Sequence, residues 1–148
     1  MSDDSMPRYD GPRALAESLS AFARASAPDA PWNREGLRDD SEYRDLGLAA
    51  ATAGRLGVKH IRALKPMGAP TGWHWHDMTA HFVYVLKGWV KFRFDGVNET
   101  VTVVAGSCLS QPGGVAHNVI GQSDDLELIE INMPAAYITV ECNVEHKT

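Results

Sequence analysis

The chain of 148 residues has little cysteine, no cluster of basic residues and no long apolar run. Its two cysteines, Cys108 and Cys142, are too few for a disulfide framework. Lys and Arg number 14 against 19 Asp and Glu, so the net charge is −5 and the basic patch typical of nucleic-acid binding is absent. No stretch approaches the ~20 apolar residues of a membrane span. We therefore expect a small-molecule partner, with no nucleic acid and no membrane.

The first five residues, Met1 to Ser5, are polar and acidic. They have neither the positive start nor the apolar core of a secretory signal. Together with the scarcity of cysteine, this favours a cytoplasmic location. A content of 44% hydrophobic and 22% charged residues is typical of a globular domain.

Residues 1–45 differ in pattern from the rest of the chain. After Pro12, apolar residues recur near the helical period of 3.6, which predicts a helix over 13–27. A polar, irregular link follows it. We therefore divide the chain into an N-terminal helix and linker, residues 1–45, and a barrel domain, residues 46–148.

From about residue 43 onward the apolar residues alternate with polar ones, as in half-buried strands. Glycine-containing turns separate these segments at short intervals, a spacing typical of an antiparallel sandwich or barrel. No strand–helix alternation is present, which argues against a parallel sheet. The expected strands cover residues 58–64, 82–86, 89–94, 99–104 and 126–131.

Three of the six histidines fall within eight residues, at His74, His76 and His81. Side chains at i and i+2 of a strand project to the same face, so His74 and His76 can aim at one point. His81 stands at an odd offset from His76, and a turn over residues 77–80 would bring it onto another strand that faces the same point. His117 follows a Pro-Gly-Gly turn that starts a further strand. Imidazole nitrogens in such a cluster suit one divalent transition-metal ion: Fe, Zn, Mn, Ni or Cu.

These residues resemble the two sequence motifs of the cupin superfamily. Gly72, His74, His76, His81 and Gly88 follow the first motif, which ends here in Tyr-Val-Leu-Lys-Gly, although the leading glycine is closer than usual. The second motif, Gly-x5-Pro-x-Gly-x2-His, is matched at every spacing, and its final Asn position is Gly121. The positions that carry this match are Gly106, Pro112, Gly114 and His117.

The resemblance covers about residues 46–134 and implies an all-β fold, the cupin double-stranded β-helix or jelly-roll barrel. It implies a metal near the centre, reached from one open end, and a homodimer. The implied ligands are His74, His76, His81 and His117. His81 stands where the family usually has a glutamate. Four neutral imidazoles leave the full 2+ charge of the ion, which favours an anionic ligand. The alternative is a three-histidine site that His81 does not join, like that of diketone-cleaving cupins.

Two further sets of residues are candidates near such a site. Glu130 alternates with apolar neighbours and, if it faces the cavity, can orient a histidine or act as a base. A solvated edge carboxylate is the alternative for Glu130. Cys108 and Ser110 alternate within the second motif and are expected to point inward.

Three functions agree with these residues. The first is a mononuclear-metal enzyme, dioxygenase-like, that acts on a small oxygenated organic molecule. The second is a non-catalytic protein that binds or senses a small ligand around a structural metal. The third is a metal-dependent isomerase or lyase. The fold alone does not distinguish them.

Overall fold

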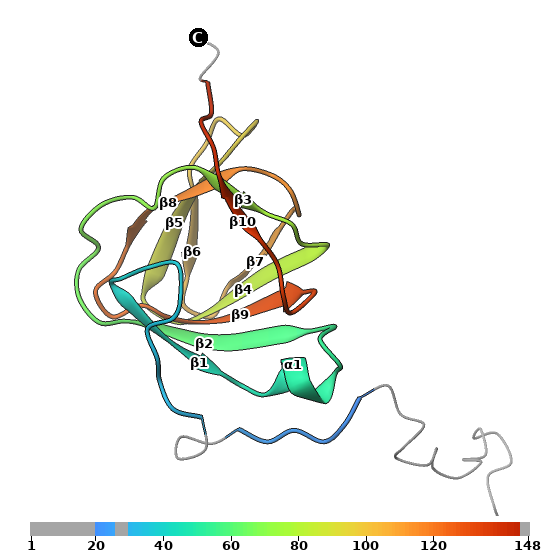
Figure 1. Ribbon diagram of the computed structural model, residues 1–148. Coiled ribbons are helices and arrows are strands. Elements are labelled where there is room, and N and C mark those ends of the chain that lie inside the picture. Colours follow the sequence, from blue (N-terminus) through green and yellow to red (C-terminus); the bar gives the residue numbers. More distant parts are fainter. Residues whose placement is uncertain (1–19, 26–29, 146–148) are drawn as a thin grey trace, which may run out of the picture.

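The computed structural model describes residues 20–25 and 30–145, which are almost entirely β-structure (Figure 1). The strands and the single short helix of these residues are β1 (Ser41–Asp45), α1 (Leu48–Ala51), β2 (Gly57–Ala63), β3 (His74–His76), β4 (Ala80–Lys87), β5 (Trp89–Phe94), β6 (Val101–Val104), β7 (Cys108–Gln111), β8 (His117–Gln122), β9 (Glu127–Met133) and β10 (Thr139–Glu141). None of the described helices is long and apolar enough to cross a membrane.

The strands form two five-stranded antiparallel sheets that face each other. Sheet A has the order β1-β2-β9-β4-β7, and sheet B has the order β10-β3-β8-β5-β6. Most neighbours in each sheet come from distant parts of the sequence, as β4 pairs with β9 and β5 with β8, whereas β1–β2 and β5–β6 pair with the next strand along the chain. The predicted all-β barrel is confirmed.

The apolar core lies between the two sheets and follows from the alternation of side chains along each strand. In β5, Val90, Phe92 and Phe94 are buried, whereas the residues between them are not. Val83 and Val85 of β4, which belongs to the opposite sheet, are buried as well. Burying each such side chain contributes roughly 1.5–3 kcal/mol to folding. Burial of the apolar residues therefore decides which face of each strand points into the barrel. A polar residue on that same face of a strand also points inward.

The N-terminal segment differs from the expectation. Residues 20–25, part of the helix predicted over 13–27, have an irregular conformation, and most of the remaining segment lies outside the described residues. The short helix α1 lies elsewhere, beside β2. Strand β1 falls within the predicted linker, yet it pairs with β2 along its whole length. A five-residue strand with charged residues at alternate positions has too weak an apolar pattern to be found from sequence.

Candidate metal centre

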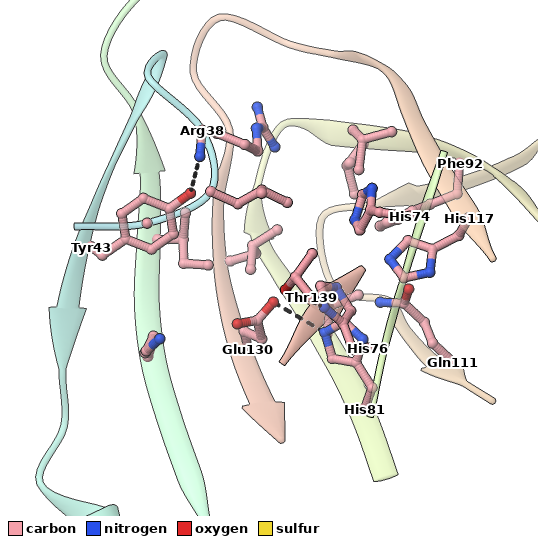
Figure 2. Close-up of a pocket in the computed structure, with 18 of the residues that line it drawn as sticks. Arg38, Tyr43, His74, His76, His81, Phe92, Gln111, His117, Glu130 and Thr139 are labelled. Atoms are coloured by element: carbon pink, nitrogen blue, oxygen red, sulfur yellow. Dashed lines mark hydrogen bonds and ion pairs between the residues drawn. The ribbon is translucent and has the colours of Figure 1, made fainter. Parts of the chain in front are cut away.

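Three histidines of sheet B meet inside the barrel. His74 and His76 project from β3, and His117 of β8 is the direct cross-strand neighbour of His74. All three are buried, with exposed fractions of 3%, 8% and 5%. One ring nitrogen of each lies within 4.8 Å of the other two (Figure 2). The three imidazoles thus lie close enough together to hold one ion, and their role as metal ligands stays a prediction.

The hydrogen bonds of these rings fix which nitrogen can bind a metal. Nδ1 of His74 lies 2.9 Å from the Gly72 carbonyl oxygen, and Nδ1 of His117 lies 3.1 Å from that of Val115. A carbonyl oxygen only accepts, so each Nδ1 carries the proton and each Nε2 keeps its lone pair. Nδ1 of His76 lies 2.8 Å from the hydroxyl of Thr139, which can accept in the same way. The arrangement therefore provides three Nε2 donors.

The surroundings also keep the rings of His76 and His117 neutral, as metal ligation requires. Burial, followed by the nearby His117, His81 and His74, lowers the pKa of His76 to about 3. Burial also lowers the pKa of His117 to about 4, and His74 and His81 add to the shift. A buried trio of imidazoles with oriented Nε2 atoms fits a divalent transition-metal ion.

A contact between two turns holds β3 and β8 in this relation. The backbone N–H of Gly114 donates to the carbonyl of His76 at 3.1 Å. Gly114 has φ of 72°, a conformation that favours glycine. At Gly113 the reason for glycine is space, because a Cβ there would lie 1.8 Å from the carbonyl oxygen of Met78. The Pro-Gly-Gly turn thus packs directly against the turn that follows His76.

His81 lies on the opposite sheet, in β4, and lines the same cavity. It is buried, and its Nε2 lies 3.0 Å from Oε2 of Glu130. Its ring centroid is 5.4 Å from that of His76 and 6.1 Å from that of His117, whereas the His74 and His117 centroids are 4.4 Å apart. His81 as a fourth ligand and a three-histidine site without His81 both stay predictions, and ligation through Nε2 would require His81 to give up Glu130.

Glu130 faces inward from β9, and its side chain is 18% exposed. Burial raises the pKa of this carboxyl, but the hydrogen bond with His81 and the charges of His81 and Lys59 outweigh it, so the pKa lies below its ordinary value of 4.5. Lys59 is the direct cross-strand neighbour of Glu130 in β2. The site thus contains an ionised carboxylate in contact with an imidazole.

The histidines and Glu130 border a cavity of about 230 Å³ between the sheets. In Figure 2 the four imidazoles lie at one side of it, and Tyr43 and Arg38 lie at the other. Gln111 is 3% exposed, and its Oε1 has no hydrogen-bond partner among the residues described. Apolar side chains form much of the remaining wall, including Ile61, Val83, Val90, Phe92, Val119 and Leu128.

Several cavity residues were not identified from sequence. Thr139, Lys59 and Tyr137 carry no motif, and only the pairing of distant strands brings them to the histidines. Gln111 directly precedes the proline of the second motif, and this position is the one feature of the sequence that could have placed it near the site. The inward orientation expected for Cys108 and Ser110 is wrong, because both are exposed on the outer side of β7. Their strand alternates in the opposite phase, with Gln111 inside.

The sequence and the fold both match known proteins. Residues 61–132 match the family model of the Cupin domain, Cupin_2. This segment holds all four cavity histidines, and the two facing sheets form the barrel that the resemblance to cupins implies. No curated protein matches the sequence significantly.

Among solved structures, the polyketide cyclase RemF from Streptomyces resistomycificus is 18% identical, with a TM-score of 0.65 over 84% of this chain and 88% of that one. KdgF from Halomonas sp. is 16% identical, with a TM-score of 0.59 over 76% and 94% of the two chains. Oxalate decarboxylase from Bacillus subtilis is 16% identical, with a TM-score of 0.60 over 95% of this chain and 41% of that one. At these identities the likeness establishes the fold.

Proposed function

We propose that the protein is a mononuclear-metal enzyme that acts on a small oxygenated organic molecule, with dioxygenase-like chemistry as the first candidate. The observation that carries this proposal is that three Nε2 donors open into a cavity that also holds the buried His81–Glu130 pair. A purely structural metal site is closed by its ligands, whereas a catalytic one keeps an open position. When bound, a divalent transition-metal ion would polarise a carbonyl, enol or carboxylate oxygen, and iron would also react with dioxygen.

The protein's own contribution is positioning and proton transfer. With Glu130 accepting a hydrogen bond from Nε2–H of His81, Nδ1 of His81 keeps its lone pair. This nitrogen can take a proton from a carbon beside a carbonyl group or from a hydroxyl group of the substrate. The carboxylate of Glu130 then stabilises the imidazolium that forms. The apolar wall excludes water and strengthens these interactions.

The same pair favours a second candidate, a metal-dependent isomerase or lyase. A buried base beside a Lewis acid is sufficient to form an enolate, and the reaction can continue without dioxygen. The two candidates differ in oxygen consumption. Iron-loaded protein should consume oxygen with a diketone, phenol or keto acid in the first case. In the second, anaerobic zinc-loaded protein should exchange a substrate C–H with deuterium from the solvent.

Elemental analysis of protein purified without chelator or histidine tag tests the metal centre, with His81→Ala beside it. We expect about one divalent ion per chain in both proteins, because the three Nε2 donors remain in the variant. We expect activity to fall by about 10²–10⁴-fold in His81→Ala, the usual contribution of a general base. Loss of the ion in His81→Ala would instead make His81 a ligand. Absence of metal from the unaltered protein would refute the proposal.

The homodimer and the cytoplasmic location stay predictions. Size-exclusion chromatography with light scattering would test the first, and fractionation of the source cells the second.

A further inference from the structure

Lys59 is a charged residue that lies on the inside of the barrel. It projects from β2 on the face that carries Ile61, which is buried in the core, and it is partly buried and lines the metal cavity. Its cross-strand neighbour in β9 is Glu130. A lysine rarely faces a largely apolar interior unless a partner compensates for its desolvation.

Within the described part of the chain, no carboxylate lies within ion-pair distance of the Lys59 ammonium group. Two carboxylates are direct cross-strand neighbours of Lys59: Glu130, whose Oε2 lies 3.0 Å from Nε2 of His81, and the exposed Asp45 of β1, whose Oδ1 accepts from the Gly47 N–H at 2.6 Å. The recorded contact of Lys59 is with an aromatic ring: its Nζ lies 5.9 Å from the ring centroid of Tyr137. A cation at that distance from a tyrosine ring gains little, so the ammonium group keeps most of its capacity to bind an anion.

Tyr137 also connects Lys59 to the metal centre. Its ring centroid lies 5.2 Å from that of His76. The distance from the Lys59 ammonium group to the His76 ring centroid therefore cannot exceed the sum of these two distances, and both residues line the same cavity. One small molecule can reach both.

The charge of the cavity favours an anion. Each candidate ligand has its Nδ1 bonded to a protein oxygen, and an imidazole that binds a metal through Nε2 is uncharged, so a bound divalent ion would keep its full charge. Lys59 adds one positive charge, and the carboxylates that line the cavity, Glu130 and the exposed Glu35, add two negative ones, so with the ion bound the balance stays positive. Arg38 also lines the cavity, but its guanidinium is paired with Asp40 at 2.9 Å.

We propose that the substrate is a small molecule with a carboxylate group, and that Lys59 binds this carboxylate while another oxygen of the molecule lies at the metal centre. The inference rests on the proposed metal centre and specifies the class of its substrate. The size agrees, because a cavity of about 150 Å³ holds benzene, and this one is about 230 Å³. It lies below the roughly 300–1,000 Å³ of pockets for drug-sized ligands.

Calorimetric titration of zinc-loaded protein with succinate and with succinamate tests the proposal. The two probes have nearly the same size, and each has one carboxylate for the metal, but only succinate has a second one for Lys59. We expect succinate to bind at least about 10-fold more tightly, as a hydrogen bond between charged groups implies. In Lys59→Met this preference should disappear, and in Lys59→Arg it should remain.

Lys91→Met is the matched control, because Lys91 lies on β5 outside the cavity, with Nζ 5.7 Å from the ring of Trp89. It should keep the full preference for succinate. Zinc content is measured in the same samples. Three results with stoichiometric zinc would overturn the role of Lys59 and leave the metal centre in place. These are equal affinities for the two probes, no binding of either probe, or a preference for succinate that survives in Lys59→Met. Protein without zinc would refute the metal centre itself.

Discussion

The two sheets contribute different kinds of group to one cavity. Sheet B provides His74, His76 and His117, three imidazoles whose Nδ1 atoms are hydrogen-bonded to the protein. Sheet A provides an ionised carboxylate, an imidazole bonded to it and an ammonium group: Glu130, His81 and Lys59. The uncharged set is suited to holding a cation, and the charged set to handling protons and anions.

Under the proposed function, this difference places metal binding and substrate chemistry on different strands. The candidate ligands stand on β3 and β8, which pair directly, whereas the charged groups stand on β2, β9 and β4. The first set can therefore be altered without changing the strands that carry the second. The three predictions that follow use this separation.

The largest effect is expected from the removal of a ligand in sheet B. His76→Ala should lower metal affinity by more than about 100-fold, since altering even an outer residue of a metal site typically costs 10–100-fold. Glu130→Gln in sheet A should retain one ion per chain. Elemental analysis after dialysis measures both. His60→Ala is the control, because His60 bonds Glu127 at 3.1 Å and does not line the cavity. Equal metal loss in Glu130→Gln would show that the two sheets do not act separately.

The metal-free protein should lose stability in acid over two overlapping ranges of pH, of which the first begins near pH 6.5 and the second near pH 4.5. The pKa values of His76 and His117, about 3 and about 4, lie below the ordinary 6.5. Between pH 6.5 and these values the unfolded chain binds protons that the folded chain does not, so the free energy of unfolding decreases as the pH falls. Glu130 has a pKa below its ordinary 4.5, so its contribution is present above that pH and is lost as the pH falls further.

Chemical denaturation of metal-free protein between pH 7 and pH 3 measures these ranges. Glu130→Gln should keep the loss that begins near pH 6.5 and reduce the one below pH 4.5. A free energy of unfolding that stays constant from pH 6.5 to pH 4.5 would contradict the assignment of neutral, buried imidazoles to sheet B.

A smaller effect is expected where the two turns meet. Gly113→Ala places a methyl group against the backbone carbonyl of Met78, and overpacking of this kind typically costs about 1–3 kcal/mol. The melting temperature should fall, and metal affinity should fall with it, because the turn positions His117 relative to His76. Gly68→Ala is the control, since no atom lies within 4 Å of its added Cβ. A normal melting temperature in Gly113→Ala would show that this contact does not hold the ligand strands.

Much of the barrel could be predicted because its central strands alternate strongly. The strand expected at residues 89–94 matches β5 at both ends, and those expected near 82–86 and 126–131 lie within or close to β4 and β9. The short strands β1 and β10 were missed. With five and three residues, they are too short to show a period, and they form because a neighbouring strand offers unpaired backbone groups.

The site was predictable to the extent that it is encoded in local spacing. His74 and His76 share a face because they are two residues apart, and the second motif supplied His117. Glu130 was placed on the correct strand, but alternation alone could not decide between the cavity and the solvent. The proximity of Lys59 to Glu130 follows from the register of β2 against β9, which no local pattern specifies.

The carbonyl groups that hold His74 and His117 belong to residues just two positions earlier in the chain. Each ring is therefore oriented by the backbone just before its own strand begins. This orientation forms when the chain folds and does not require a bound ion. A trio fixed in this way should capture metal without a slow rearrangement, and chelation should leave the barrel folded. Such a fixed trio also adapts little to the coordination preferences of different ions. The geometry of the site and the supply of metal in the cell should therefore decide which ion binds, more than the intrinsic order of metal affinities does.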